Sequence, residues 1–173
     1  MVELNPTIDH VRGEPDARVI LEYGDYECPY SRQAYRAIEQ VERRLEGRVR
    51  FAFRHFPLTE IHPHALAASS AAEAAALQGR FWEMHDALFH HQKALEDQDL
   101  RRYAEDLGLD VEAFDRDRGG ERVFERISRD VDGGIASGEV LGTPTLFIDG
   151  AAHLGAYDAD TLVETLTRWP SSS

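Results

Sequence analysis

The first third of the chain changes from one hydrophobic spacing to another. Residues 19–23 form a short run of β-branched and aromatic residues, which predicts a buried strand. In 31–45 the apolar positions recur with the spacing of an amphipathic helix. In 49–54 large apolar residues alternate with small or charged ones, which predicts a second strand. A strand, a helix and a strand over this length predict a βαβ unit with a right-handed crossover.

The middle of the chain has helical patterns, and its last third returns to strands. Helices are expected over 64–78, 80–91, 97–107, 110–117 and 122–137. Strands are expected over 143–148 and 151–154, joined by the hairpin signal Asp149-Gly150, and a closing helix over 159–169. Residues 1–17 are polar and predict an arm or an edge strand.

The order βαβ, helical block, ββα predicts an α/β protein in which the two ends of the chain form one layered unit. We expect this unit to comprise residues 1–60 and 126–173. The block 61–125 is then an inserted, all-helical subdomain.

Composition narrows the possible partners. The 173 residues are 42% apolar, enough for one buried core or a domain with an insertion. The net charge of −13 argues against nucleic acid, and no polybasic stretch suggests binding to an anionic membrane surface. Since no apolar run approaches the length of a membrane span and no signal peptide is visible, we expect a cytoplasmic location.

The eight histidines lack the spacing of a helical zinc site, so we expect structural or surface roles for them and no bound metal.

The candidate chemistry centres on Cys28, the chain's single cysteine, in the tetrapeptide Cys28-Pro29-Tyr30-Ser31. The cysteine lies between a predicted strand and a predicted helix, where free N–H groups and the helix dipole favour a thiolate. Pro29 suits the first helical position. This position predicts a reactive, exposed thiol. The acidic neighbours Asp25 and Glu27 act against it, since like charges disfavour the thiolate.

Several segments together resemble the DsbA family of thioredoxin-fold thiol–disulfide oxidoreductases. The resemblance covers nearly the whole chain and rests on four stretches: 22–30, 53–58, 79–86 and 142–145. It implies a thioredoxin fold with a helical insertion and a cis peptide bond before Pro144. It further implies that Thr143 contacts the cysteine, and that Glu22 is a partly buried acid beneath the site. On the same grounds we expect Pro29, Tyr30, Thr143 and Pro144 to contact substrate.

Ser31 departs from the family pattern, which has a second, resolving cysteine there. Ser31 cannot close an internal disulfide, although its hydroxyl is able to donate a hydrogen bond to a Cys28 thiolate. The sequence therefore predicts a monothiol oxidoreductase with Cys28, Ser31 and Glu22 as its catalytic residues. It would act on protein or small-molecule thiols and disulfides, with no cofactor beyond glutathione or another low-molecular-weight thiol as co-substrate.

Three alternatives fit the same residues. In the first, Ser31 is an engineered replacement for a resolving cysteine, made to trap a mixed disulfide, and the natural protein is an ordinary dithiol oxidoreductase. A glutathione transferase or isomerase of the kappa type shares the fold, although such enzymes usually place serine where this chain has Cys28. A non-catalytic module that binds extended chains by backbone pairing is the third.

Overall fold

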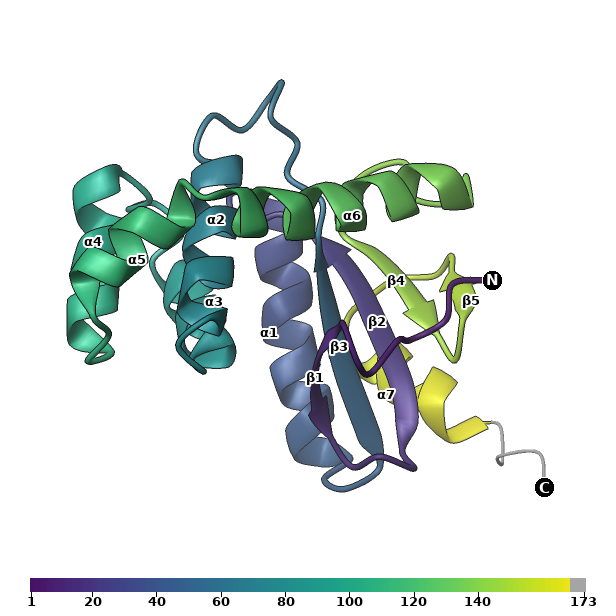
Figure 1. Cartoon of the computed structure of the whole chain (residues 1–173). Helices are drawn as coiled ribbons and strands as arrows, with labels where there is room; N and C mark the ends of the chain where they lie inside the picture. Colours follow the sequence, from purple (N-terminus) through teal and green to yellow (C-terminus); the bar gives the residue numbers. More distant parts are fainter. Residues whose placement is uncertain (169–173) are drawn as a thin grey trace.

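The computed structural model describes residues 1–168, which form seven helices and five strands. Figure 1 shows their arrangement. The strands are β1 (His10–Gly13), β2 (Arg18–Gly24), β3 (Val49–His55), β4 (Thr145–Ile148) and β5 (Ala151–His153). The helices are α1 (Pro29–Arg44), α2 (Ala65–Ala76), α3 (Phe81–His90), α4 (Asp97–Asp106), α5 (Val111–Arg118), α6 (Glu121–Ser137) and α7 (Ala159–Arg168).

One mixed sheet forms the centre of the molecule, with strand order β1-β3-β2-β4-β5. β2 and β3 are parallel, and α1 connects them as the predicted βαβ unit. The other neighbouring strands pair antiparallel. The predicted hairpin joins β4 to β5 through Asp149 and Gly150, both of which have positive φ.

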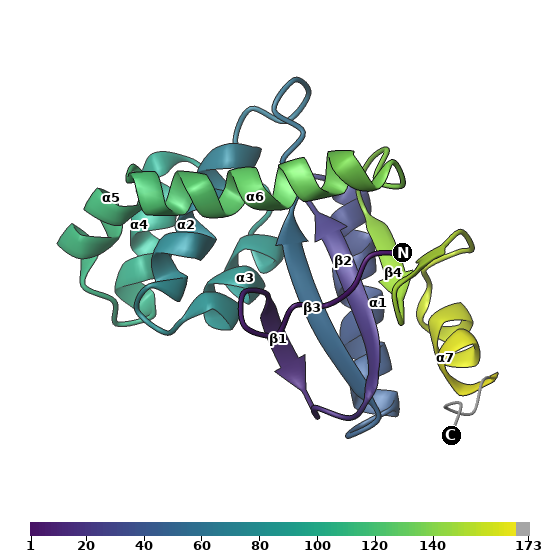
Figure 2. The ribbon, with the colours of Figure 1, turned by 45° about the vertical axis from the view of Figure 1, so that its right-hand side comes forward.

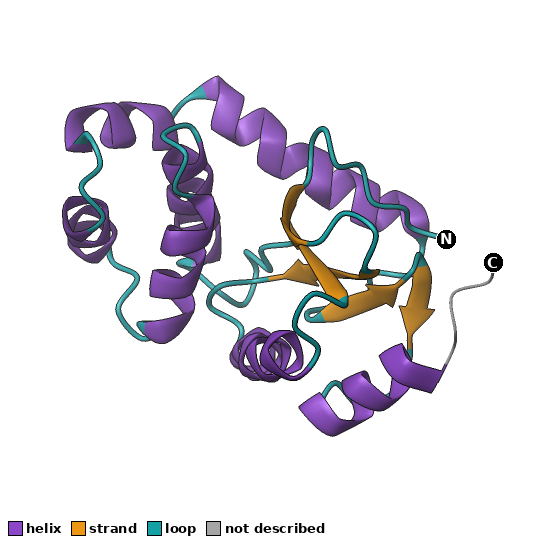
Figure 3. Ribbon diagram, turned by 90° about the horizontal axis from the view of Figure 1, so that it is seen from below, coloured by secondary structure: helices purple, strands orange, loops and turns teal. Residues whose placement is uncertain are grey.

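Helices cover both faces of the sheet, as Figure 3 shows from below. α1 and α7 lie together on one face, where α1 buries Ala37, Ile38 and Val41 in the main core. α6 crosses the opposite face, next to β3. A smaller apolar cluster including Val2, Leu21, Tyr23 and Phe147 lies outside the main core. This arrangement confirms the predicted α/β thioredoxin fold with its helical insertion.

The helical block α2 to α5 lies beside the sheet, and α6 runs from it across the sheet toward β4 (Figure 2). The main core is continuous between the two parts: Phe51 and Phe53 of β3 belong to the same buried cluster as Met84, Leu88 and Phe114 of the block. The insertion boundaries 61 and 125 stay a prediction, and residue 125 falls inside α6. No helix among residues 1–168 is both long and apolar enough to cross a membrane.

The observed elements follow the predicted ones closely, with small shifts at their ends. The 1–17 segment contains the edge strand β1, which pairs with β3. α1 begins at Pro29, two residues before the predicted start, because a proline is favoured in the first helical position. β4 begins only after Pro144. The predicted last residue of the closing helix, Trp169, lies outside the described part of the chain.

Candidate active site

Cys28 is the residue immediately before α1, at the end of the loop that follows β2. Its backbone is extended, and its carbonyl oxygen accepts from the Arg32 N–H at 3.1 Å, the first bond of the helix. Its own N–H donates to the Asp25 carbonyl at 3.1 Å, which closes a tight turn. The sulfur therefore lies at the start of a sixteen-residue helix, where free N–H groups and the helix dipole favour an anion.

The loop before β4 meets this sulfur from the other side. The Cys28 thiol donates to the Thr143 carbonyl oxygen at 3.5 Å, across 115 residues of sequence. The peptide bond between Thr143 and Pro144 is cis. The hydroxyl of Thr143 is buried with no hydrogen-bond partner among residues 1–168. The structure thus brings together Cys28, Thr143 and Pro144.

The expectation of an exposed thiol is wrong. Cys28 is 3% exposed, with its sulfur against the Thr143 carbonyl. Pro29 is exposed and Tyr30 is 60% exposed, so the two residues after the cysteine form the open side of the site.

Ser31 is fully buried beneath the same turn. Its hydroxyl oxygen accepts from the Asp25 N–H at 3.2 Å, so this side chain fixes the loop that carries Cys28. The predicted donation from Ser31 to a Cys28 thiolate stays a prediction.

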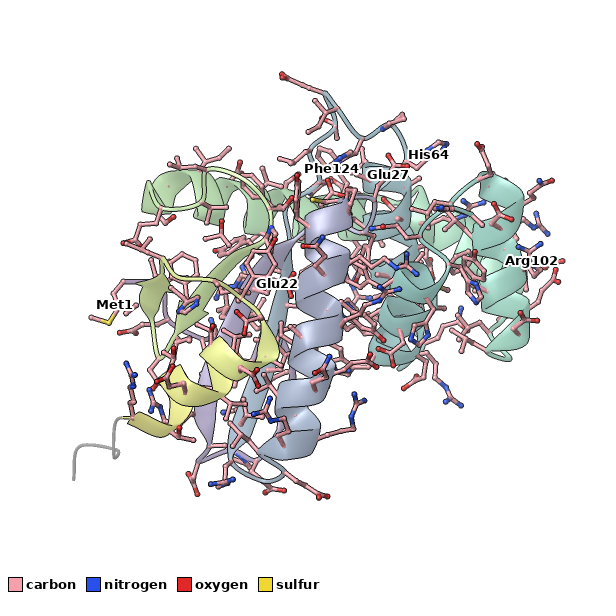
Figure 4. The ribbon with its side chains drawn as sticks, turned by 180° about the vertical axis from the view of Figure 1, so that it is seen from behind. Met1, Glu22, Glu27, His64, Arg102 and Phe124 are labelled. Atoms are coloured by element: carbon pink, nitrogen blue, oxygen red, sulfur yellow. The ribbon has the colours of Figure 1, made fainter. Side chains whose placement is uncertain are left out.

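The two acidic residues before Cys28 are held by histidines of the loop between β3 and α2. Asp25 is fully buried and accepts from the Leu58 N–H at 2.9 Å, with His62 Nδ1 at 2.8 Å from the same oxygen. Glu27 accepts from the His64 N–H at 2.9 Å, and His64 Nδ1 lies 2.7 Å from its other carboxylate oxygen. Figure 4 shows Glu27 and His64 next to each other at the start of α1.

This pairing changes the electrostatics around the thiol. The hydrogen bond to Glu27 raises the pKa of His64, so this imidazole carries positive charge to a higher pH than usual. A protonated His64 offsets the Glu27 carboxylate, which the sequence suggested would act against a thiolate. Sequence reasoning assigned structural or surface roles to the histidines and did not connect His62 and His64 with the acids, which lie 37 residues earlier.

Glu22 is buried in the middle of β2, as the resemblance implies. It is 1% exposed, and its Oε1 has no hydrogen-bond partner within the described residues. Burial raises its pKa to about 8, against an opposing contribution from Arg12. A Cβ at Gly24 would lie 2.8 Å from Glu22 Oε1 and 2.5 Å from the Phe53 ring, so only glycine fits beside this carboxyl group. Figure 4 shows Glu22 within the sheet.

Tyr157, just before α7, is a neighbour of the site that the sequence did not indicate. Burial raises its pKa, and the charges of Cys28, Tyr30 and Glu22 raise it further. No motif surrounds Tyr157, so only the folded structure reveals its place near the cysteine.

One other side-chain cluster has the composition of a metal site. His10, His55 and Glu73 have ligand atoms within 4.8 Å of one another. His10 Nε2 and His55 Nε2 each lie 2.7 Å from Glu73 Oε1. These are hydrogen-bonding distances, and the two imidazoles lower the pKa of Glu73 although burial alone would raise it. The cluster is therefore a buried, hydrogen-bonded carboxylate that connects β1 and β3 to α2.

Comparison with known proteins places the chain in a family. The model of the family described as thioredoxin matches residues 6–168, so the chain belongs to the thioredoxin family. Its fold is DsbA-like. A thioredoxin-like oxidoreductase from Silicibacter pomeroyi is 27% identical with a TM-score of 0.81, covering 92% of this chain and 91% of that one. BdbD from Bacillus subtilis is 21% identical with a TM-score of 0.80, over 94% and 92% of the two chains.

Curated relatives are much longer proteins. The chain is 46% identical over 168 residues to a Na(+)/H(+) antiporter, NhaA 1, of Salinispora arenicola. It is 42% identical over 164 residues to the antiporter NhaA of Herminiimonas arsenicoxydans. The matches cover 96% and 94% of this chain but 26% of each antiporter, so the chain spans about a quarter of the length of these relatives.

Proposed function

We propose that this chain is a thiol–disulfide oxidoreductase that works through Cys28 alone, by way of a mixed disulfide. The observation that carries the proposal is the placement of the Cys28 sulfur between the start of α1 and the Thr143 carbonyl, with a serine where a resolving thiol would stand. The structural neighbours that are named as oxidoreductases support the general activity.

The proposed reaction is an exchange at sulfur. The Cys28 thiolate attacks one sulfur of a disulfide, the S–S bond breaks, and the second sulfur leaves as a thiolate. Cys28 is oxidised to the mixed disulfide, and the leaving sulfur is reduced. An external thiol, such as glutathione, then attacks the mixed disulfide and restores Cys28. Such a cycle suits the removal of glutathione-type adducts or the shuffling of disulfides, and it does not produce a net dithiol oxidation.

The neighbouring residues have separate roles in this proposal. Pro29 and Tyr30 form the open side of the site, and the backbone at Thr143 and Pro144 pairs with an extended substrate. Glu22, whose pKa is about 8, is a proton store beneath the thiol. Ser31 holds the turn that carries Cys28.

Intact-mass measurement after incubation with oxidised glutathione tests the proposal, over a pH series and with Cys28→Ala as the control. The expected result is one glutathione adduct on the wild-type chain, removed by added reduced glutathione, and none on the variant. Absence of an adduct at every pH would reject thiol chemistry and favour a binding module. Tight glutathione binding without an adduct would favour a kappa-type transferase.

The match to antiporters suggests a second candidate function, that of a unit which serves a Na(+)/H(+) antiporter. The supporting observation is 46% identity over almost the whole chain to one segment of such a protein. The test measures Na(+)/H(+) exchange in vesicles that carry the antiporter, with either this chain or its Cys28→Ala variant present. Exchange that responds to oxidised glutathione only with the wild-type chain is expected, and equal exchange in both would reject it. The cytoplasmic location stays a prediction.

A further inference from the structure

A basic groove borders the turn that carries Cys28. It is a groove of about 400 Å³ whose lining includes Glu27, Pro29, Arg32, Arg36, Gln92 and Lys93. Arg32 and Arg36 are one helical turn apart on α1, and Lys93 comes from the segment between α3 and α4. A volume of this size suits a small molecule.

The three cations of this basic groove have no ion-pair partner within residues 1–168, although the chain has a net charge of −13. Most other arginines are paired: Arg12 with Glu42, Arg54 with Asp9, Arg101 with Asp115 and Arg126 with Asp130. Like charges at i and i+4 of a helix, such as Arg32 and Arg36, destabilise it slightly. A cluster of unpaired cations in so acidic a chain therefore marks a site for an anion.

The acid in this lining, Glu27, is paired with His64 and makes no ion pair with the three cations of the basic groove among residues 1–168. Both carboxylate oxygens of Glu27 are engaged by His64, through its N–H at 2.9 Å and its Nδ1 at 2.7 Å. The N–H donors of Arg32, Arg36 and Lys93 are therefore not used by this carboxylate and are available to a ligand.

Gln92 connects the lining of the basic groove to the backbone of Cys28. Its side-chain amide donates to the Cys28 carbonyl at 2.8 Å and to the Tyr26 carbonyl at 2.9 Å. Lys93 follows Gln92 directly in the chain, and Pro29 follows Cys28. A ligand held in the groove therefore has a defined position relative to the thiol, which favours a reaction between them.

We propose that the basic groove binds the carboxylates of a low-molecular-weight disulfide, of which glutathione disulfide is the probe, and presents its S–S bond to Cys28. This inference rests on the proposed function. In the step, Cys28 thiolate bonds to one glutathione sulfur, the S–S bond breaks, and the other glutathione leaves as a thiolate. Cys28 is oxidised and the departing glutathione is reduced, so the electrons balance.

Three disulfides of different charge test the inference: anionic glutathione disulfide, neutral bis(2-hydroxyethyl) disulfide and cationic cystamine. The rate of Cys28 modification is measured by intact mass, and each rate is divided by that of the same disulfide with 2-mercaptoethanol. The expected order is anionic, then neutral, then cationic. The preference should diminish as salt is added, because Arg36 and Lys93 are exposed and Arg32 is only half-buried.

Arg36→Gln and Lys93→Gln should each lower the anionic-to-neutral rate ratio roughly two- to fivefold, the size expected for loss of an exposed ion pair. Arg43→Gln is the matched control, since Arg43 is also an exposed arginine of α1 without an ion pair among residues 1–168 but lies away from the groove. Its ratio should equal that of the wild type. Because the ratio uses a neutral disulfide, a general change in thiol reactivity leaves it unaltered.

The outcomes separate the inference from the proposed function. Reaction with all three disulfides at equal normalised rates, unchanged in Arg36→Gln and Lys93→Gln, would overturn the basic groove and leave the thiol chemistry standing. An equal fall in the ratio for Arg43→Gln would also overturn it, because net charge alone would then explain the preference. Failure of Cys28 to react with any of the disulfides would overturn both proposals.

Discussion

Glu27 and His64 form a two-point contact beside Cys28. The carboxylate accepts from the His64 N–H at 2.9 Å, and His64 Nδ1 lies 2.7 Å from its other oxygen. His64 Nε2 lies 3.1 Å from Glu96, so the imidazole links two carboxylates. The residue next to Cys28 is therefore a carboxylate that is paired with a histidine from another loop.

Replacement of His64 by alanine should slow the reaction of Cys28 with oxidised glutathione. The Glu27 carboxylate would then lack its imidazole partner, and an uncompensated negative charge next to a thiol disfavours the thiolate. The measurement is the adduct rate by intact mass at low and high salt, with His153→Ala, on β5, as the control. A rate equal to that of the wild type at low salt would show that His64 does not influence the thiol.

Glu22 should make the protein less stable as the pH rises. Its pKa is about 8 in the folded chain against an ordinary value of 4.5, so the folded state binds its proton more tightly than the unfolded state. The stability that this proton contributes is complete below about pH 4.5 and is lost as the pH rises through about 8. The loss is roughly 5 kcal/mol, since each tenfold change in proton affinity corresponds to about 1.4 kcal/mol.

Urea unfolding across this pH range measures the effect. Glu22→Gln, which cannot ionise, should remove most of the slope and be more stable than the wild type at about pH 9. Glu112→Gln, at an exposed acid on α5, should keep the wild-type slope. A slope that persists in Glu22→Gln would assign the pH dependence to another group.

Much of the fold follows from local pattern. The strand expected at 19–23 is β2, and the strand expected at 49–54 is β3, because buried strands depend on short apolar runs that are visible in the sequence. Proline at the first position of a helix favours the start of α1 at Pro29. The observed ends of helices and strands differ from the predicted ends by one or two residues, because contacts with the surrounding structure determine where each element ends.

The site was only partly predictable. Cys28 was identified from its position between a strand and a helix, and Glu22 and Thr143 from the family resemblance. The low exposure of Cys28 and the contacts of His62 and His64 were missed, because they depend on loops that meet only after folding, 115 and 37 residues from their partners. No local periodicity encodes such contacts.

The buried ion pair between Asp9 and Arg54 should be essential for stability. Arg54 donates through Nε at 2.8 Å and Nη2 at 2.7 Å to the two carboxylate oxygens of Asp9, and through Nη1 at 2.9 Å to the Tyr23 hydroxyl. It thereby fixes the polar N-terminal segment against the sheet. Arg54→Gln leaves the Asp9 charge buried and should cost about 3–5 kcal/mol in the free energy of unfolding.

The matched control for this variant is Arg44→Gln, which removes the exposed pair between Arg44 and Asp160 and should cost less than about 1 kcal/mol. Urea unfolding at neutral pH measures both. If the two variants lost similar amounts of free energy of unfolding, burial of the Asp9–Arg54 pair would not explain how much the pair stabilises the protein.

Ser31→Cys should convert the monothiol site into a dithiol site. The new thiol would lie one helical turn from Cys28, at a position where the present hydroxyl is buried in the same turn. After reaction with oxidised glutathione, the glutathione adduct should be lost without any added thiol, leaving an internal disulfide two mass units below the reduced chain, because the second thiolate attacks the mixed disulfide. Intact mass with time follows this conversion, with Ser69→Cys in α2 as the control for replacement of another buried serine. If the adduct on Ser31→Cys persisted as it does on the wild type, position 31 would not be a resolving position, and the absence of a second thiol would not explain a monothiol mechanism.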